Sequence, residues 1–313
     1  RRQGQSRASN GEELLRVQRL QGTVDHDAPR RIGDCTVTER SLHMSGGLAR
    51  GDPKTFVFDL DGVVYVGHAG VPGAGETLAA LDRAGHQVLF ATNNSSRGVG
   101  TVIENIRKRT GYHATSEAVI TSGLAAADLL RDDGERCFVF GSEELEHTLV
   151  TEGIDVTRDH ASATAVVVGL DRGLTYERLT NAVLAVRRGA RLIATNDDAT
   201  YPAKDTQYPG CGAIVAAVER AAGVTAEVCG KPHVPMQRLI ERRIEHEDVW
   251  MVGDRVETDL ALADQAGWGK ILVLSGVTGP DAVAVSTPRP HHTIGSIADL
   301  GKLVSTETLG VEG

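Results

Sequence analysis

The most constraining feature of the sequence is a short apolar run that ends in two closely spaced carboxylates. Residues 56–58, Phe-Val-Phe, lead directly into Asp59 and Asp61, and Gly62 follows. An apolar run of β-branched and aromatic residues that stops at a glycine is typical of a buried parallel strand. Because ligands in open α/β sheets bind beyond the carboxyl ends of such strands, the sequence predicts two acidic side chains at the mouth of a sheet.

The two carboxylates also limit which ligand this site can take. Carboxylates this close repel each other and raise one pKa unless a cation lies between them. Oxygen ligands without His or Cys suit a hard cation such as Mg²⁺. An EF-hand loop starting at Asp59 would need an oxygen ligand at its fifth position and Glu at its twelfth, but Val63 and Gly70 stand there. An ordinary turn-forming acidic pair remains the alternative on this stretch alone.

Strand and helix patterns alternate along the chain, which predicts an α/β fold with a parallel sheet. Residues 51–132 and 208–305 read as one Rossmann-like core. Residues 133–207 form a second alternating unit that looks like a smaller α/β cap inserted into the core. Within it, residues 197–212 read as a long loop, and such loops are usually functional. Residues 306–313 read as a flexible tail.

Composition excludes several classes of protein. The formal net charge is -9 and only 4% of residues are aromatic, which argues against nucleic acid as a partner. No apolar stretch approaches a membrane span, so no membrane association is expected. The four cysteines are widely spaced without a C-x-x-C pair, which fits a reducing cytoplasm. Residues 1–50 are rich in Arg and lack Lys, and we expect a disordered leader there, with Met44 as a candidate start. An Arg-rich transit peptide is the alternative, although the acids of this segment argue against it.

Polar side chains follow four of the predicted strands or turns. They are Asp59 and Asp61, Thr92, Asn93 and Asn94, Lys231, and Asp254 and Asp259. Each type has a use in phosphoryl transfer: a carboxylate can attack phosphorus, hydroxyl and N–H groups can bind phosphate oxygens, and a lysine can neutralise charge. Acids that converge on Mg²⁺ would complete such a site. Each piece alone is weak, and their joint placement at strand ends carries the hypothesis.

These residues resemble the haloacid dehalogenase-like hydrolases, and most closely the NagD-like phosphatases with a large α/β cap. The resemblance covers residues 52 to 305. The core motifs that carry it are Phe58-Asp59-Leu-Asp61-Gly62, Ala91-Thr92-Asn93-Asn94-Ser95, Gly230-Lys231-Pro232 and Gly253-Asp254-Arg-Val-Glu-Thr258-Asp259. The cap segments Val168-Gly-Leu-Asp171, Thr195-Asn196-Asp-Asp198 and Pro209-Gly-Cys-Gly212 are also similar.

The resemblance implies a role for each core residue. It makes Asp59 the nucleophile and a Mg²⁺ ligand, and Asp61 the general acid/base whose backbone carbonyl also binds the metal. It makes Asp254 the third protein ligand and Asp259 an acid that orients metal-bound water or Lys231. Thr92, Asn93, Asn94 and Lys231 would hold the phosphate. Because caps in this family often pair, a homodimer through the cap stays open.

The sequence thus predicts a Mg²⁺-dependent cytoplasmic phosphatase acting on a small phosphorylated metabolite. A roofed site should favour glycerol phosphate or phosphoglycolate, then sugar phosphates or pyridoxal phosphate, with p-nitrophenyl phosphate as a typical substrate of the family. Polar cap residues expected to contact the leaving group are Asp171, Arg172, Asn196, Asp198 and Tyr201. The alternatives are a phosphotransferase or mutase on the same scaffold, a non-catalytic phosphate-ligand-binding regulator and, less favoured, a receiver-type signalling domain.

Overall fold

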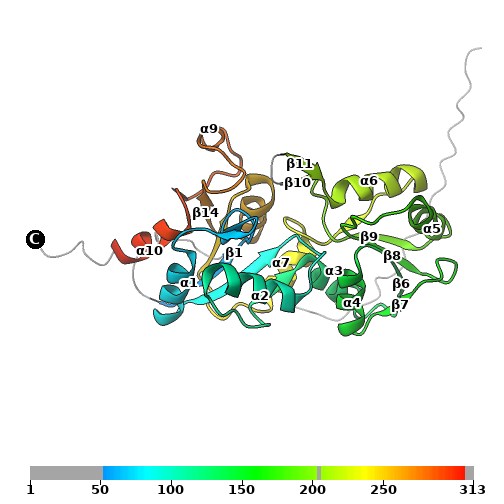
Figure 1. The fold of residues 1–313 in the computed structure, drawn as a ribbon, viewed down its shortest axis with the longest axis horizontal. Helices are drawn as coiled ribbons and strands as arrows, with labels where there is room; N and C mark the ends of the chain where they lie inside the picture. The colour runs from blue at the N-terminus through cyan, green and yellow to red at the C-terminus, as the bar shows by residue number, and fades with distance from the viewer. Residues whose placement is uncertain (1–51, 203–205, 307–313) are drawn as a thin grey trace, which may run out of the picture. The chain divides into compact units, whose positions relative to one another are not determined.

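The computed structural model describes residues 52–202 and 206–306 of the chain. It confirms an α/β fold built on two sheets of parallel strands, one in the core and one in the cap (Figure 1). The predicted leader, residues 1–50, lies outside the described residues. So does the predicted tail, except that helix α10 continues to Thr306. None of the helices within these described residues could span a membrane.

Six parallel strands form the core sheet, in the order β15-β14-β13-β1-β4-β5. Their bounds are Thr55–Phe58 (β1), Gln87–Thr92 (β4), Val119–Thr121 (β5), Val249–Gly253 (β13), Gly269–Val273 (β14) and His292–Ile294 (β15). From β1 the chain builds one side of the sheet with β4 and β5, and later the other side with β13, β14 and β15. Strand β1 therefore lies at the switch point of the topology, where open sheets leave a crevice for ligands.

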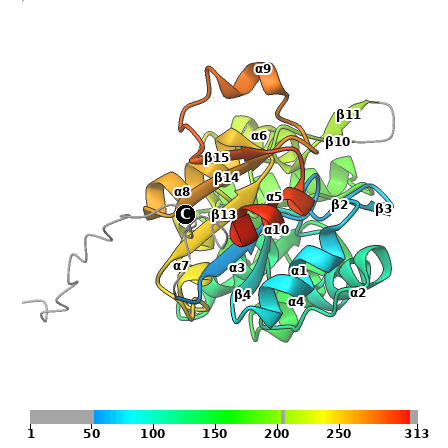
Figure 2. The same cartoon turned by 90° about the vertical axis from the view of Figure 1, so that its left-hand side faces the viewer.

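Helices cover both faces of the core sheet, which explains why its strands are apolar without alternation. Phe56 and Phe58 face a cluster formed with α1, α2 and α10, whereas Val57 faces the opposite cluster with α3, α7 and α8. Burying each such side chain contributes about 1.5–3 kcal/mol. The helices, several of which are seen in Figure 2, are Ala74–Arg83 (α1), Val99–Thr110 (α2), Ser122–Leu130 (α3), Val234–Glu241 (α7), Ala261–Ala266 (α8) and Ile297–Thr306 (α10). A short π-helix, Val256–Leu260 (η1), precedes α8, and a four-residue helix, Pro280–Val283 (α9), follows β14.

The cap sheet has five parallel strands in the order β12-β9-β8-β6-β7. Its elements are Arg136–Phe140 (β6), Glu143–Thr151 (α4), Asp155–Thr157 (β7), Ala165–Val168 (β8), Tyr176–Arg187 (α5), Arg191–Ala194 (β9), Cys211–Ala222 (α6) and Glu227–Val228 (β12). Helices α5 and α6 pack on one face of this sheet. On the other face, α4 joins the hydrophobic cluster that also contains α3 of the core.

The cap extends further along the sequence than the predicted end at residue 207. Strand β12 pairs with β9, and α6 buries its apolar face in the cap's own hydrophobic cluster. The boundary therefore has to be corrected to Val228. The reason is physical: β12 is only two residues long and pairs with a strand more than 30 residues away, so no local pattern indicates it.

Two short antiparallel hairpins stand beside the sheets. In the first, Tyr65–Val66 (β2) pairs with Ala69–Gly70 (β3). The predicted long loop at residues 197–212 contains a second hairpin, Thr200–Pro202 (β10) with Gln207–Pro209 (β11), which projects beside α6 (Figure 2). The two tyrosines of this hairpin, Tyr201 and Tyr208, pack edge to face with ring centroids 5.9 Å apart.

Candidate active site

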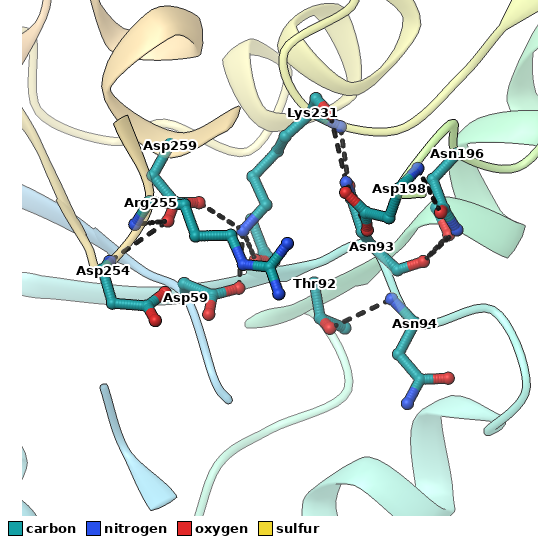
Figure 3. Close-up of polar contacts among 12 residues, drawn as sticks. Asp59, Thr92, Asn93, Asn94, Asn196, Asp198, Lys231, Asp254, Arg255 and Asp259 are labelled. Atoms are coloured by element: carbon teal, nitrogen blue, oxygen red, sulfur yellow. Dashed lines mark hydrogen bonds and ion pairs between the residues drawn. The ribbon is translucent and has the colours of Figure 1, made fainter. Parts of the chain in front are cut away.

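The carboxyl ends of β1, β4 and β13 meet the loop before α7 at one cavity of about 1620 Å³ (Figure 3). Core and cap residues both line it. The predicted core residues on its wall are Asp59, Asp61, Thr92, Asn93, Asn94, Lys231, Asp254 and Asp259. The fold thus gathers all eight predicted core residues, which span more than 190 positions of the sequence, into one site.

Lys231 lies at the centre of the polar contacts. Its side chain is only 2% exposed, and Nζ lies 2.6 Å from Asp59 Oδ1 and 2.7 Å from Asp259 Oδ1. It also donates to the carbonyl oxygen of Ala91 at 2.7 Å. Burial opposes the charged ammonium, but the carboxylates of Asp259 and Asp59 outweigh it and raise the pKa of Lys231. The lysine is therefore a permanent cation that joins the ends of three core segments.

Asp59 follows β1 directly and is 9% exposed. Its backbone N–H donates to the carbonyl of Val252 at 2.9 Å, which continues the pairing of β1 with β13. Burial raises the pKa of Asp59, Lys231 opposes this rise, and the charges of Asp259 and Asp254 add to it. One carboxylate oxygen is held by Lys231, which fixes the position of the side chain.

Asp259 shapes the turn that carries Asp254. Its Oδ2 accepts from the backbone N–H groups of Asp254 at 3.2 Å and Arg255 at 3.1 Å, while Oδ1 pairs with Lys231. A Cβ at Gly253 would lie only 2.2 Å from Cβ of Asp259, so this close approach requires glycine. Both oxygens of Asp259 are thus engaged within the protein.

Asp254 has one engaged and one free carboxylate oxygen. Oδ2 accepts from the N–H of Val277 at 2.7 Å, but Oδ1 is buried without a hydrogen-bond partner. Burial raises the pKa of Asp254 to about 6, and the nearby charge of Asp259 adds to this effect. A buried carboxylate oxygen without a partner is costly unless a cation binds there.

The donor set fits a hard divalent cation. One carboxylate oxygen from each of Asp59, Asp254 and Asp259 lies within 4.8 Å of the others. All three ligand atoms are oxygens, as Mg²⁺ requires. Because Asp259 is committed to Lys231 and to two backbone N–H groups, Asp59 and Asp254 are the better placed ligands. This agrees with the expectation that Asp259 orients Lys231 or metal-bound water and is not itself a metal ligand.

Asp61 lies at the mouth of the same cavity, with an exposed side chain. The N–H of Gly62 donates to the carbonyl of Tyr65 at 2.8 Å, which makes a tight turn after Asp61. Gly62 has φ +98° and faces Asp254, so a side chain is excluded there. The surrounding protein raises the pKa of Asp61 by limiting its contact with bulk water, while Arg97 and Arg109 oppose the rise. A raised pKa suits a group that must give and take a proton.

Thr92 ends β4 with a buried hydroxyl on the cavity wall. Its oxygen accepts from the N–H of Asn94 at 3.2 Å, which leaves its proton free to donate to a ligand. The Asn94 side chain accepts from the backbone and hydroxyl of Ser96, and so stabilises the turn itself. The side chain of Asn93 points to Lys231 and Asp198 (Figure 3).

The predicted cap residues also line the cavity, but the protein already engages most of them. Asp171 is buried, pairs with Arg178 and accepts from the N–H of Gly173 at 2.8 Å. The guanidinium of Arg172 lies 5.2 Å from the ring centroid of Tyr201. Arg172 and Tyr201 therefore remain the cap residues best placed to meet a leaving group.

Asn196 and Asp198 reach the core instead. Asn196 donates to the carbonyl of Asn93 at 2.7 Å, and Asp198 accepts from the side-chain amide of Asn93 at 3.2 Å. The hydroxyls of Ser95 and Thr195 lie 2.9 Å apart beside them. The polar end of cap strand β9 is thus bonded to the polar end of core strand β4.

Sequence reasoning missed a cation in the site, Arg255. Its guanidinium projects into the middle of the site in Figure 3 and lines the cavity. Within the described part of the chain, this guanidinium forms no hydrogen bond or ion pair, although the backbone of Arg255 bonds to Asp259. Burial raises the pKa values of Asp198 and Asp254, and the charge of Arg255 opposes both rises. Its place directly after Asp254 was the available signal.

Comparison with known proteins agrees with this geometry. A family profile described as haloacid dehalogenase-like hydrolase matches residues 56–155, and a profile described as HAD hydrolase-like matches residues 228–300. These two ranges contain every predicted core residue of the cavity. An acid sugar phosphatase from Staphylococcus saprophyticus is 32% identical over 253 residues, which span 80% of this chain and 97% of the relative.

Two solved structures are similar in fold as well as in sequence. NagD from Escherichia coli K-12 matches with a TM-score of 0.72 and 31% identity, covering 79% of this chain and 98% of that one. A glycerol phosphate phosphatase from Mycobacterium tuberculosis, in complex with magnesium, matches with a TM-score of 0.74 and 32% identity. That match covers 80% of this chain and 78% of the other. The similarity therefore extends over most of the chain.

Proposed function

The chain belongs to the haloacid dehalogenase-like hydrolases and is a phosphatase of that family, and we propose that it hydrolyses small phosphate monoesters with Mg²⁺ through an aspartyl-phosphate. One observation carries the proposal. Asp59 stands at the switch point of the core sheet, one oxygen held by buried Lys231, beside the unpartnered oxygen of Asp254. This chemistry needs a nucleophile and, beside it, a carboxylate oxygen that is available to bind a metal ion.

In the first step, a carboxylate oxygen of Asp59 forms a bond to phosphorus as the bond to the leaving oxygen breaks. Asp61 donates its proton to that leaving oxygen. Thr92 donates a hydrogen bond to a phosphoryl oxygen, the positive charge of Lys231 offsets the developing negative charge, and Arg255 is a further cation on the cavity wall. Fixed donors that meet developing charge are usually the largest contribution to such catalysis.

In the second step, water attacks the phosphorus of the aspartyl-phosphate and Asp61 takes up its proton. The bond between phosphorus and the Asp59 oxygen breaks, which releases inorganic phosphate, restores the Asp59 carboxylate and leaves Asp61 protonated for the next cycle. Asp59 and Asp254 would hold Mg²⁺, which would supply positive charge against repulsion between carboxylate and phosphate. The raised pKa of Asp61 favours its use as both acid and base.

The cavity indicates the size of the substrate. Cap residues line the same space as the nucleophile, so a folded phosphoprotein would have to displace the cap to reach Asp59. We propose glycerol phosphate, phosphoglycolate or a sugar phosphate as the substrate class, consistent with the names of the sugar phosphatase and glycerol phosphate phosphatase relatives. Cytoplasmic location and a homodimer through the cap stay predictions.

A panel assay tests the proposal. The purified protein, with Mg²⁺, is offered small phosphate esters, p-nitrophenyl phosphate and a folded phosphoprotein, and phosphate release is measured. We expect turnover of at least one small ester well above that of the phosphoprotein. Release from the phosphoprotein alone, or none from any ester, would contradict the proposed function.

A further inference from the structure

Both ends of the side-chain amide of Asn93 are hydrogen-bonded to protein groups. Oδ1 accepts from the backbone N–H of Lys231 at 2.7 Å, and Nδ2 donates to the backbone carbonyl of Lys231 at 3.1 Å. Nδ2 also donates to Asp198 Oδ2 at 3.2 Å. This pairing of the amide with both backbone groups of one residue fixes Lys231 relative to the end of β4 (Figure 3).

The backbone beside Lys231 is also packed tightly against Asn93 and the end of cap strand β9. A Cβ at Gly230 would lie 2.6 Å from Asn93 Oδ1, 2.7 Å from the carbonyl oxygen of Thr195 and 2.9 Å from Cβ of Asn196. Such distances exclude any side chain at Gly230 without movement of the backbone. Three segments, from the core, the cap and the Lys231 loop, therefore meet at Asn93.

Asp198 supports the orientation of the Asn93 amide that the backbone N–H and C=O of Lys231 already require. A carboxylate accepts hydrogen bonds but cannot donate one, so it selects the NH₂ end of the amide. With Nδ2 held toward Asp198, Oδ1 is left to accept from the N–H of Lys231. A hydrogen bond to a charged acceptor is stronger than a neutral one, so the orientation is well determined.

We propose that Asp198 and Asn93 are positioning residues that hold Lys231 against Asp59, so that the end of cap strand β9 fixes the catalytic lysine. This inference rests on the proposed function, and it replaces the expectation that Asp198 contacts the leaving group. Asp198 acts through Asn93, and Asn93 acts through the backbone of Lys231, whose Nζ meets Asp59 at 2.6 Å. Small displacements of such a group have large effects on rate.

A double-mutant cycle tests the inference on the full chain with Mg²⁺. Variants Asp198→Ala, Asn93→Ala and the double variant are assayed with glycerol phosphate and with p-nitrophenyl phosphate. We expect kcat/KM to fall about tenfold in Asp198→Ala and further in Asn93→Ala, by the same factor for both esters. In the Asn93→Ala background, removing the Asp198 carboxylate should change kcat/KM less than twofold.

A conservative variant and a matched control separate positioning from general damage. Asp198→Asn keeps an acceptor for Nδ2 and should recover most of the activity. Asp197→Ala alters the neighbouring acid, whose carboxylate lies 3.2 Å from the exposed His233 ring instead, and should have little effect. Loss of kcat/KM that differs between the two esters, or that persists in full without Asn93, would overturn the inference.

The same cycle is measured on the affinity for inorganic phosphate by calorimetry, which does not depend on turnover. We expect the affinity to fall in both single variants, with the effects again non-additive. If the wild-type protein binds phosphate but hydrolyses no ester, the proposed function fails, and the inference is judged on the phosphate data alone. Additive losses of phosphate affinity would contradict it.

Discussion

The core and cap sheets both consist of parallel strands and both carry polar residues beyond their strand ends, but within the described residues these polar groups differ in how completely they are paired. At the end of β8 in the cap, Asp171 is paired with Arg178. At the end of β13 in the core, Asp254 keeps a buried oxygen without a hydrogen-bond partner. A polar strand end is therefore not by itself a site. The two ends differ because, at β13, the fold leaves a buried carboxylate oxygen without a hydrogen-bond partner.

The cations of the two sheet ends differ in the same way. Lys231 is almost completely buried between two carboxylates, with its side chain 2% exposed. Arg178 is 35% exposed and donates to the carbonyl of Gly141 at 2.7 Å in addition to pairing with Asp171. The cap cation thus pairs with its acid near solvent, whereas the core cation offsets the charges of Asp59 and Asp259 away from solvent.

We expect the largest change in kcat when one acid at the end of each sheet is replaced by Asn and the two variants are compared. Asp59→Asn removes the nucleophile and should lower kcat at least a thousandfold with the fold intact. Asp171→Asn should lower kcat less than tenfold, because Asp171 faces Arg178. Phosphate release and circular dichroism check both variants. Equal losses in the two variants would break the distinction between the sheets.

Removal of the metal should have the next largest effect. Exhaustive chelation should lower activity at least a hundredfold, and added Mg²⁺ should restore it. Mg²⁺ should also raise the melting temperature by a few degrees, because it binds the folded state. Asp254→Asn should abolish this shift and Asp171→Asn should preserve it. Full activity after chelation would disprove a metal site at the core sheet.

Replacing the buried cation Lys231 should destabilise the protein more than replacing the partly exposed cation Arg178. Lys231→Met leaves Asp59 and Asp259 buried without their counter-charge, which should cost about 3–5 kcal/mol of unfolding free energy in EDTA. Arg178→Met should cost about 1 kcal/mol, since solvent screens the pair with Asp171. Urea denaturation at pH 7 measures both. Similar losses would show that burial does not separate the two cations.

The smallest expected effect concerns the amino end of the core sheet. His86 Nδ1 accepts from the backbone N–H of Lys54 at 3.0 Å, and burial, aided by the charge of Lys54, lowers the pKa of His86 below 6.5. The folded state therefore binds fewer protons than the unfolded state. Stability from this contact is complete above pH 6.5 and is lost as pH falls below it.

A variant isolates that contribution. His86→Gln should flatten the pH dependence of the urea midpoint between pH 6.5 and 5, while kcat at pH 7 stays within twofold of the wild type. This would show that the two ends of the core sheet serve stability and catalysis separately. An unchanged pH dependence would mean that the Lys54 contact does not contribute to stability.

Local patterns were sufficient to predict the fold class and most of the core site. An apolar run before Asp59, or before Gly253 and Asp254, predicts a buried strand, because only burial on both faces permits continuous apolar residues. Strand ends of a parallel sheet meet at one edge, so the gathering of Asp59, Thr92 and Asp254 follows from the pattern.

The tertiary structure alone decided which partner each polar group finds. Sequence patterns place Asn93 and Asp198 after strands, but they do not show that the two side chains face each other and the backbone of Lys231. The type of a polar side chain does not show which partner it will bond to, and these contacts join residues more than 100 positions apart in the sequence. The same holds for β12, since two residues become a strand only when β9 is beside them.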